Sequence, residues 1–282
     1  MQLKREEYEE PACLLNMNRE PAQSRIPITR IISKLDTLLG KKEYDSACRL
    51  LKNWLDEADA AGDRQGRLAV LNEQIGLYRK LEMKSECLQA IEEALCLFKE
   101  LNFGETVTGA TTCINAATGY RAFGKTEDAL PLYMHAQTVY EKLLPPGNGR
   151  LAGLYNNMAL TLTALKRYSE AGTMFMKAMD ILEQTENSEP ELAITLLNLA
   201  DLVYAEQGPE EGETRIGEYL DRAEILLDSG NISKDGYFAY VCEKCAPVFG
   251  FYGYFFAEKK LEERAGKIRN SLINSEEGQT TR

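Results

Sequence analysis

Residues 124–136 read GKTEDALPLYMHA, and residues 166–178 read KRYSEAGTMFMKA. The two stretches align without a gap at a shift of 42 residues. Each has an alanine, an aromatic residue four places later and a second alanine three places after that. Self-similarity at a fixed period of about 20 to 50 residues is typical of repeat architectures. The chain is therefore predicted to consist of stacked repeats.

The same frame continues on both sides of these stretches. The first alanine position is occupied in successive units by Ala47, Cys87, Ala129, Ala171 and Ile216, at spacings of 40, 42, 42 and 45. Seven residues later stand Trp54, Ala94, Ala136, Ala178 and Ala223. The longer last spacing falls at residues 207–212, where Gly208 and Pro209 predict a longer loop between two helices.

Each unit is predicted to be an antiparallel pair of amphipathic helices, because apolar residues recur at intervals of three and four in both halves. No stretch alternates like a strand, so an all-α solenoid of helix pairs is expected. The predicted pairs are 28–61, 64–102, 105–144, 149–185, 189–229 and 233–275. Residues 1–27 contain three prolines and no helical period, which predicts an extended or partly disordered segment. Residues 276–282 are predicted to be a disordered tail.

The charge of the chain argues against nucleic acid as a partner. Lys and Arg number 33 and Asp and Glu 44, which gives a net charge of −11. A chain of this sign repels a phosphate backbone. The charge is concentrated in residues 181–228, where thirteen acidic residues face only Arg215 and Arg222, a local balance of −11. This stretch is either a solvated face or a patch for a basic partner.

The first residues and the cysteines indicate a cytoplasmic protein. Residues 1–10 mix charges and have no apolar run, unlike a signal peptide or membrane anchor. The most apolar stretch, residues 246–257, is far shorter than the roughly 20 residues of a membrane span. Seven cysteines, an odd number, do not suggest a disulfide framework.

Residues for catalysis or metal binding are sparse. His135 is the single histidine of the chain and is expected to be exposed on a second helix. Cys242 and Cys245 form a C-x-x-C motif, but no second pair or nearby histidine completes four zinc ligands. No glycine-rich phosphate loop follows a strand. We predict a non-enzymatic protein without cofactor or metal, and the cysteine pair leaves a thiol redox enzyme as a remote alternative.

The repeated positions resemble tetratricopeptide repeats. That family places a small residue in the first helix, an aromatic or aliphatic one three later, a glycine, and then alanine, aromatic and alanine in the second helix. The corresponding residues here are Ala117, Tyr120, Gly124, Ala129, Tyr133 and Ala136. The segments at 154–159 (LYNNMA) and 196–200 (LLNLA) are similar to the 42-residue variant of kinesin light chains and bacterial peptide-sensing regulators. The resemblance implies a right-handed superhelix whose concave face is lined by first helices.

The resemblance also implies an asparagine ladder in that groove. Asn115, Asn157 and Asn198 stand two residues before the small position of their first helices, and Asn72 stands one place earlier in its unit. Carboxamides donate and accept, so such a ladder can hold the backbone of an extended peptide. The same spacing would also arise if these side chains linked neighbouring helices to each other.

The groove is predicted to be basic at its early end. Arg79, Arg121, Thr163 and Tyr204 follow the small positions, and Lys80 stands beside the first of them. Arginines there favour a ligand carboxylate, because guanidinium and carboxylate pair in bidentate geometry. They could equally be solvated charges paired with Glu73 or Glu82. Asp201 favours the opposite ligand charge at the other end.

These observations predict an adaptor or regulator that binds a protein or peptide in its groove. The alternative is a self-assembling module, because nine aromatic residues lie between Tyr237 and Phe256. These aromatic residues either cap the solenoid core or form an interface with a partner or with a second copy of the chain in a homodimer. Pro247 is expected to kink or end its helix.

Overall fold

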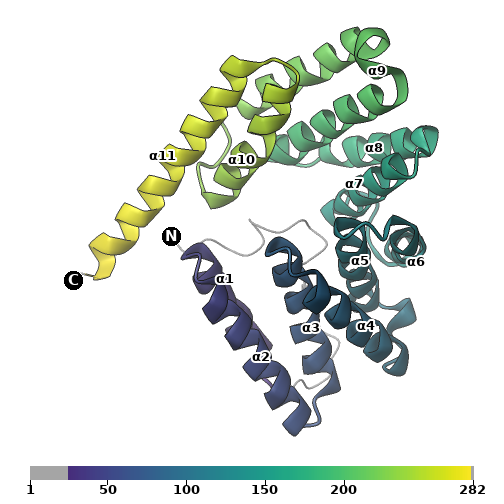
Figure 1. Cartoon of the computed structure of the whole chain (residues 1–282), viewed down its shortest axis with the longest axis vertical. Helices are drawn as coiled ribbons and strands as arrows, with labels where there is room; N and C mark the ends of the chain where they lie inside the picture. Colours follow the sequence, from purple (N-terminus) through teal and green to yellow (C-terminus); the bar gives the residue numbers. More distant parts are fainter. Residues whose placement is uncertain (1–24, 281–282) are drawn as a thin grey trace. The chain divides into compact units, whose positions relative to one another are not determined.

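A computed structural model describes residues 25–280, which are mainly α-helical (Figure 1). The α-helices of the described range are α1 (Ile28–Gly40), α2 (Tyr44–Ala60), α3 (Arg64–Lys80), α4 (Lys84–Glu100), α5 (Val107–Ala122), α6 (Thr126–Leu143), α7 (Gly149–Ala164), α8 (Tyr168–Leu182), α9 (Glu189–Leu227), α10 (Gly236–Phe251) and α11 (Phe255–Thr280). One turn of 3-10 helix, Phe103–Glu105, precedes α5. Residues 25–280 contain no strand, so the predicted all-α repeat fold is confirmed for them.

The repeat frame coincides with close helix packing. Four of the small residues at the first alanine position, Ala47, Cys87, Ala129 and Ala171, are fully buried. Small side chains there let the two helices of a pair approach closely, as α3 and α4 or α5 and α6 do. Neighbouring pairs also touch, because α3 and α4 both contact α5. The apolar stripes of one pair therefore form the core with the next pair.

The loops inside four pairs share one backbone conformation. Lys42, Glu82, Gly124 and Lys166 each stand two residues after a first helix and have positive φ angles of 57°, 57°, 79° and 59°. Each donates its backbone N–H to the carbonyl three residues earlier. This left-handed residue satisfies a helix-end carbonyl and turns the chain toward the second helix. Gly124 adopts this conformation without the steric cost that a side chain carries.

Asp63 fixes the start of α3 and the segment before α1. Its Oδ1 accepts a hydrogen bond from the Gly66 amide at 2.8 Å, which caps the helix. Its Oδ2 accepts from the amides of Arg25 and Ile26 at 2.6 and 3.0 Å. Ile26, 6% exposed, is thereby held in the core. Residues 25–27 are thus anchored, whereas residues 1–24 of the predicted disordered segment lie outside the described residues.

The α9 helix is two helices that meet at Gly208. This residue has φ 81° and ψ 176°, and Pro209 follows it. The loop expected at residues 207–212 is replaced by this single non-helical residue, because glycine alone provides the reversal and proline can begin the next helix. Gly212 then packs tightly against Val203, where an added Cβ would lie 2.8 Å from Cγ1.

The last pair differs in two respects from its prediction. Pro247 was expected to kink or end its helix, yet α10 continues through it to Phe251. Proline has no backbone N–H to donate, but α10 ends within about one turn after Pro247, so only a short part of the helix follows it. The second difference is that α11 extends to Thr280, beyond residue 275, and no proline interrupts this stretch.

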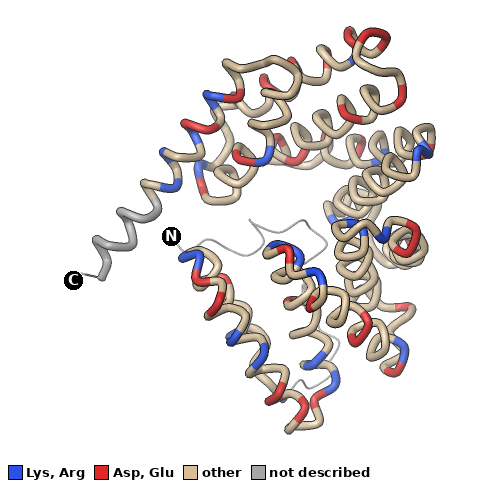
Figure 2. Tube along the Cα trace, in the orientation of Figure 1, with Lys and Arg blue, Asp and Glu red and all other residues tan. Residues whose placement is uncertain are grey.

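The described chain divides into two compact units, which are treated separately below. The N-terminal unit comprises residues 25–161 and the C-terminal unit residues 162–280, so the boundary lies inside α7. Figure 2 shows acidic residues spread along both arms of α9 in the C-terminal unit. No helix among the described residues is both long and apolar enough to cross a membrane.

Candidate functional site

First helices of the N-terminal unit carry a row of asparagines. Asn72 on α3, Asn115 on α5 and Asn157 on α7 are 1%, 2% and 3% exposed. Buried carboxamides need hydrogen-bond partners, because an unpaired buried polar group destabilises the fold. Their partners therefore decide between the peptide-holding role and the helix-linking role that the sequence left open.

Asn72 and Asn115 are linked to each other. Nδ2 of Asn115 donates to Oδ1 of Asn72 at 2.9 Å. Nδ2 of Asn72 donates in turn to the carbonyl of Leu68 and to Oγ1 of Thr112, both at 3.0 Å. This chain of hydrogen bonds ties α3 to α5. Oδ1 of Asn115 is buried without a hydrogen-bond partner among the described residues, so one acceptor in the row is unused.

Asn157 has a different neighbour, the guanidinium of Arg121. Nη2 of Arg121 lies 3.4 Å from Oδ1 of Asn157, at the long limit of a hydrogen bond. Arg121 is half-buried and forms no ion pair with a carboxylate in the described part of the chain. Its buried Nε also lacks a hydrogen-bond partner there. Most of the five donors of this guanidinium are therefore unused by the protein.

Two further basic side chains lie at the end of α3. Arg79 is half-buried, and Lys80 is exposed with Nζ 5.8 Å from the centroid of the Tyr44 ring. The positive charge of Arg79 opposes the effect of burial on Cys87, although burial wins and raises the pKa of that thiol to about 11. Basic residues thus stand at the C-terminal ends of α3 and α5, where the helix dipole favours cations.

The remaining two predicted site residues belong to the C-terminal unit. Asn198 on α9 is half-buried. Tyr204, also on α9, is 37% exposed, and its ring packs edge to face against Phe251 and Tyr252 of the last pair. The sequence frame located Tyr204 but did not indicate these aromatic neighbours, which are 47 and 48 residues away.

The candidate redox residues lie in the core. Cys242 and Cys245 on α10 are 0% and 1% exposed, and burial raises their pKa values to about 11 and about 12. A thiol of this kind is a poor nucleophile near neutral pH. Within residues 25–280 no group of three or more His, Cys, Asp or Glu side chains is arranged to hold a metal. His135, expected to be exposed, is half-buried with its ring 5.9 Å from that of Phe98, because its position beside Ala136 faces α4.

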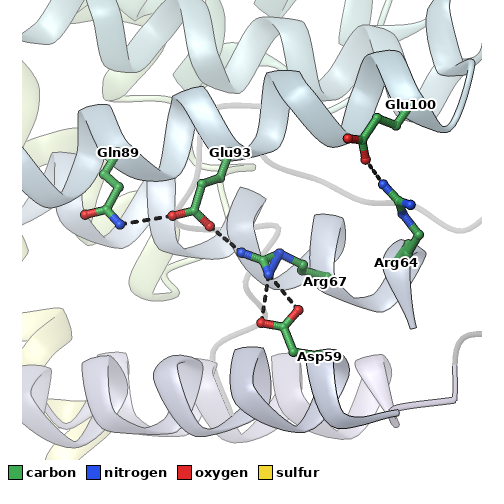
Figure 3. Close-up of polar contacts among 6 residues, drawn as sticks. All are labelled: Asp59, Arg64, Arg67, Gln89, Glu93 and Glu100. Carbon is green, nitrogen blue, oxygen red and sulfur yellow. Dashed lines mark hydrogen bonds and ion pairs between the residues drawn. The ribbon is translucent and has the colours of Figure 1, made fainter. Parts of the chain in front are cut away.

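Figure 3 shows an ion-pair network that the sequence did not indicate. Nη1 of Arg67 on α3 donates to both carboxylate oxygens of Asp59 on α2, at 2.6 and 2.8 Å, and Nη2 donates to Glu93 on α4. Nε2 of Gln89 donates a hydrogen bond to Oε1 of Glu93 at 3.0 Å, and Arg64 forms an ion pair with Glu100. The two arginines and three carboxylates of this network border a pocket of 410 Å³. Each guanidinium has a carboxylate partner, so the network joins three helices and leaves neither arginine unpaired.

Comparison with known families identifies the repeat. The family model described as tetratricopeptide repeat matches residues 150–225, from the start of α7 to the second arm of α9. The repeats of this stretch are tetratricopeptide repeats. No curated protein matches the chain in sequence.

Several solved structures share its fold. BtubC (BKLC) from P. vanneervenii aligns with a TM-score of 0.54 at 18% identity, covering 83% of this chain and 92% of that one. A kinesin-light-chain-like protein of Podospora anserina with nearly identical TPR-like repeats gives 0.52 at 17% identity, covering 73% and 96%. Its Q17M variant gives 0.52 at 17%, covering 74% and 97%. The predicted resemblance to kinesin light chain repeats is therefore confirmed at the level of fold.

The family indicates a broad class of function. Tetratricopeptide repeats are generally protein-interaction modules, and proteins built from them are typically non-enzymatic scaffolds. Stacked repeats create extended surfaces whose ligand is chosen by a few side chains. The particular surface and ligand must therefore come from the geometry of this chain.

Proposed function

We propose that this tetratricopeptide repeat protein is a non-enzymatic adaptor or regulator that binds a segment of another protein at Arg121 and Asn157. The segment lies against the first helices of the N-terminal unit. We also infer a cytoplasmic location, since an odd number of cysteines, seven, is typical of a reducing compartment.

The unused donors of Arg121 carry this proposal. A half-buried guanidinium with one hydrogen bond of 3.4 Å and no carboxylate partner keeps its charge without compensation from the protein. Polar groups in such an environment usually have a partner, and an external one fits here. Arg67, by contrast, meets two carboxylates within the fold.

A carboxylate is the ligand group that matches Arg121 best. Carboxylates accept paired hydrogen bonds from a guanidinium, and partial burial strengthens the pair by lowering the local dielectric. Asn157 orients the guanidinium from one side, and Arg79 adds positive charge at the end of α3. In this arrangement Asn72 and Asn115 support the surface from behind. The proposed ligand is therefore an acidic side chain or a C-terminal carboxylate on an extended segment.

Self-assembly is a second candidate function. It is supported by large aromatic side chains exposed at the last pair, with Phe251 64% and Phe256 80% exposed. Apolar patches of this kind often mark interfaces. Analytical ultracentrifugation over a range of concentrations tests it, since a homodimer formed through residues 237–256 would dissociate on Phe256→Glu substitution.

A peptide selection tests the main proposal. Random peptides displayed on phage are selected against the whole chain, and the best binder is titrated against wild-type protein and two variants. Arg121→Gln is expected to weaken binding about tenfold, and more at low salt, because ions screen a charge pair that is still partly open to solvent. Asn157→Ala is expected to weaken it by about 1 to 3 kcal/mol with little change in melting temperature.

Arg64→Gln is the matched control, since Arg64 is already paired with Glu100. It should leave peptide affinity unchanged. A selection that yields no binder, or binders that tolerate Arg121→Gln as well as Arg64→Gln, would show that this surface is not the binding site.

A further inference from the structure

Three aromatic rings gather at one point of the C-terminal unit. Tyr204 of α9 packs against Phe251 at the end of α10, with ring centroids 5.3 Å apart and planes at 80°. Tyr252, the next residue, lies 6.0 Å from Tyr204 and 4.9 Å from Phe251, at 76° and 85°. The three rings form a mutually edge-to-face aromatic cluster. Edge-to-face packing is a favourable geometry, so the rings hold each other in place.

This aromatic cluster is held at the surface rather than in the core. Phe251 is 64% exposed and Tyr204 is 37% exposed. A rigid cluster offers ring faces to a ligand at little entropic cost, because its rotamers are already fixed. The negative potential above an aromatic face attracts cations, and arginine in particular stacks on such rings.

A carboxylate stands beside the rings. The hydroxyl of Tyr252 donates to Oδ1 of Asp201 at 2.9 Å. Asp201 is exposed and forms no ion pair with a lysine or arginine in residues 25–280. Two cations of the same unit, Lys260 and Arg264, are instead bound to Asp228. Asp201 therefore keeps an uncompensated negative charge next to the aromatic cluster.

The wider electrostatic setting has the same sign. Phe251 is the last residue of α10, and a helix C-terminus carries partial negative charge. The α9 helix, which provides Tyr204 and Asp201, lies within the stretch of net charge −11 at residues 181–228 (Figure 2). Rings, carboxylate and helix terminus all favour a positively charged ligand at one place.

We propose that the aromatic cluster of Tyr204, Phe251 and Tyr252, with Asp201, binds an arginine-bearing segment of a protein partner. The guanidinium stacks on the exposed ring faces and pairs with the carboxylate of Asp201. This rests on the proposed protein-binding function and names the ligand chemistry of its C-terminal unit, which is opposite to the acidic ligand assigned to Arg121.

Charge also favours such a partner over a second copy of the chain. A twofold dimer formed at the aromatic cluster would place the same acidic surface on both sides of the interface. Like charges facing each other oppose association, whereas a basic segment is attracted at long range. The exposed rings are therefore better matched by a cationic partner than by themselves.

The test uses a synthetic, dye-labelled heptapeptide with three arginines spaced by glycines, and an otherwise identical peptide with citrulline in place of arginine. Citrulline keeps the planar shape but removes the charge. At near-physiological salt the wild-type chain should bind the arginine peptide about tenfold more tightly than the citrulline peptide. Phe251→Leu and Asp201→Asn should each weaken arginine-peptide binding about fivefold or more.

Two matched variants separate a site from general attraction to an acidic protein. Phe256→Leu makes the same change at an exposed ring that takes no part in the aromatic cluster, and Glu218→Gln removes one exposed charge from α9. Both should stay within about twofold of wild type. If Glu218→Gln weakens binding as much as Asp201→Asn, or if citrulline binds as well as arginine, the proposal is overturned.

Circular dichroism of each variant checks folding, and sedimentation of the wild-type chain tests the other occupant. A wild-type dimer that becomes monomeric on Phe251→Leu would assign the aromatic cluster to a second copy and overturn the proposal. Arg121→Gln is titrated in parallel. If Arg121→Gln leaves arginine-peptide binding unchanged and the phage selection yields no acidic binder, the result supports this inference and refutes the proposed surface at Arg121. If the selection yields acidic peptides whose binding Arg121→Gln weakens, but the arginine peptide does not bind, this inference alone is refuted.

Discussion

Asn115 donates a 2.9 Å hydrogen bond to Asn72, which stands 43 residues earlier in the chain. Both side chains are almost completely buried between first helices of neighbouring pairs. These two carboxamides therefore stabilise the packing of neighbouring pairs, besides any contact with a ligand. Its members differ, because Asn157 meets a guanidinium instead of another carboxamide.

Asn72→Ala is expected to lower the free energy of unfolding by about 2 kcal/mol. The change removes the acceptor of Asn115 Nδ2 and the donor to Thr112 Oγ1 in the interior, and lost buried hydrogen bonds are costly. Denaturant unfolding followed by circular dichroism measures the loss. Asn198→Ala, at a half-buried position, is the control and should cost less. Equal losses for the two would contradict the helix-linking role of Asn72.

Gly109→Ala is expected to destabilise the protein by about 2 kcal/mol or more through steric overlap. An added Cβ would lie 1.9 Å from the carbonyl oxygen of Phe103 in the turn before α5. Gly147→Ala is the matched substitution, because nothing lies within 4 Å of its added Cβ. Thermal unfolding should show the control within about 0.5 kcal/mol of wild type. An unperturbed Gly109→Ala protein would mean that this turn does not pack against α5 as described.

Glu191→Gln is expected to stabilise the protein at neutral pH and to have little effect near pH 4. Burial raises the pKa of Glu191 above its ordinary value of 4.5, despite an opposing hydrogen bond from Tyr237. The folded state then binds more protons than the unfolded state from about that value up to the raised pKa, so stability falls as pH rises through this window. Glutamine stays neutral throughout and removes the loss.

The measurement for Glu191 is the melting temperature of wild type and variant from pH 4 to pH 8. Glu186→Gln, which changes an exposed carboxylate in the loop before α9, is the control and should change the melting temperature little. A Glu191→Gln protein with the wild-type profile would show that this carboxylate is solvated when folded.

Cys96 is expected to react with iodoacetamide faster than Cys242 and Cys245 by about two orders of magnitude, because buried thiols with raised pKa values are inert. Cys96 is exposed, whereas burial raises the pKa of Cys242 to about 11 and of Cys245 to about 12. Peptide mass mapping over time gives the individual rates. Rapid alkylation of the C-x-x-C pair in the native chain would revive the redox function that the sequence left as an alternative.

The helix pairs could be derived from the sequence because the signals that define them are local. Ala129 and Ala136 mark one helix by their spacing, and Gly208 followed by Pro209 marks where α9 must break. The exact form of that break was less predictable. A loop and a single glycine of positive φ have similar composition, and the close packing of Gly212 against Val203, which accompanies the tighter form, cannot be read from composition.

The contacts of the candidate site residues could not be predicted from the sequence. The repeat frame identified Asn72, Asn115, Asn157 and Arg121 as one family of positions, yet it could not distinguish a side chain that links two helices from one with unused donors. That distinction depends on a second residue about forty places away, whose distance no local pattern records. The aromatic cluster shows the same limit, since Tyr204 and Phe251 come from different helix pairs.

The sequence by itself therefore determined an all-α stack of tetratricopeptide-type pairs, because periodicity, small crossing residues and helix ends act over a few turns of one chain segment. Only the tertiary structure decided that Asn72 and Asn115 bind each other, that Arg67 is compensated while Arg121 is not, and that Asp201 lies beside three rings. These relationships arise when side chains from separate pairs are brought within hydrogen-bonding or van der Waals distance, and at that range differences of a few ångströms determine which groups are left to bind a partner.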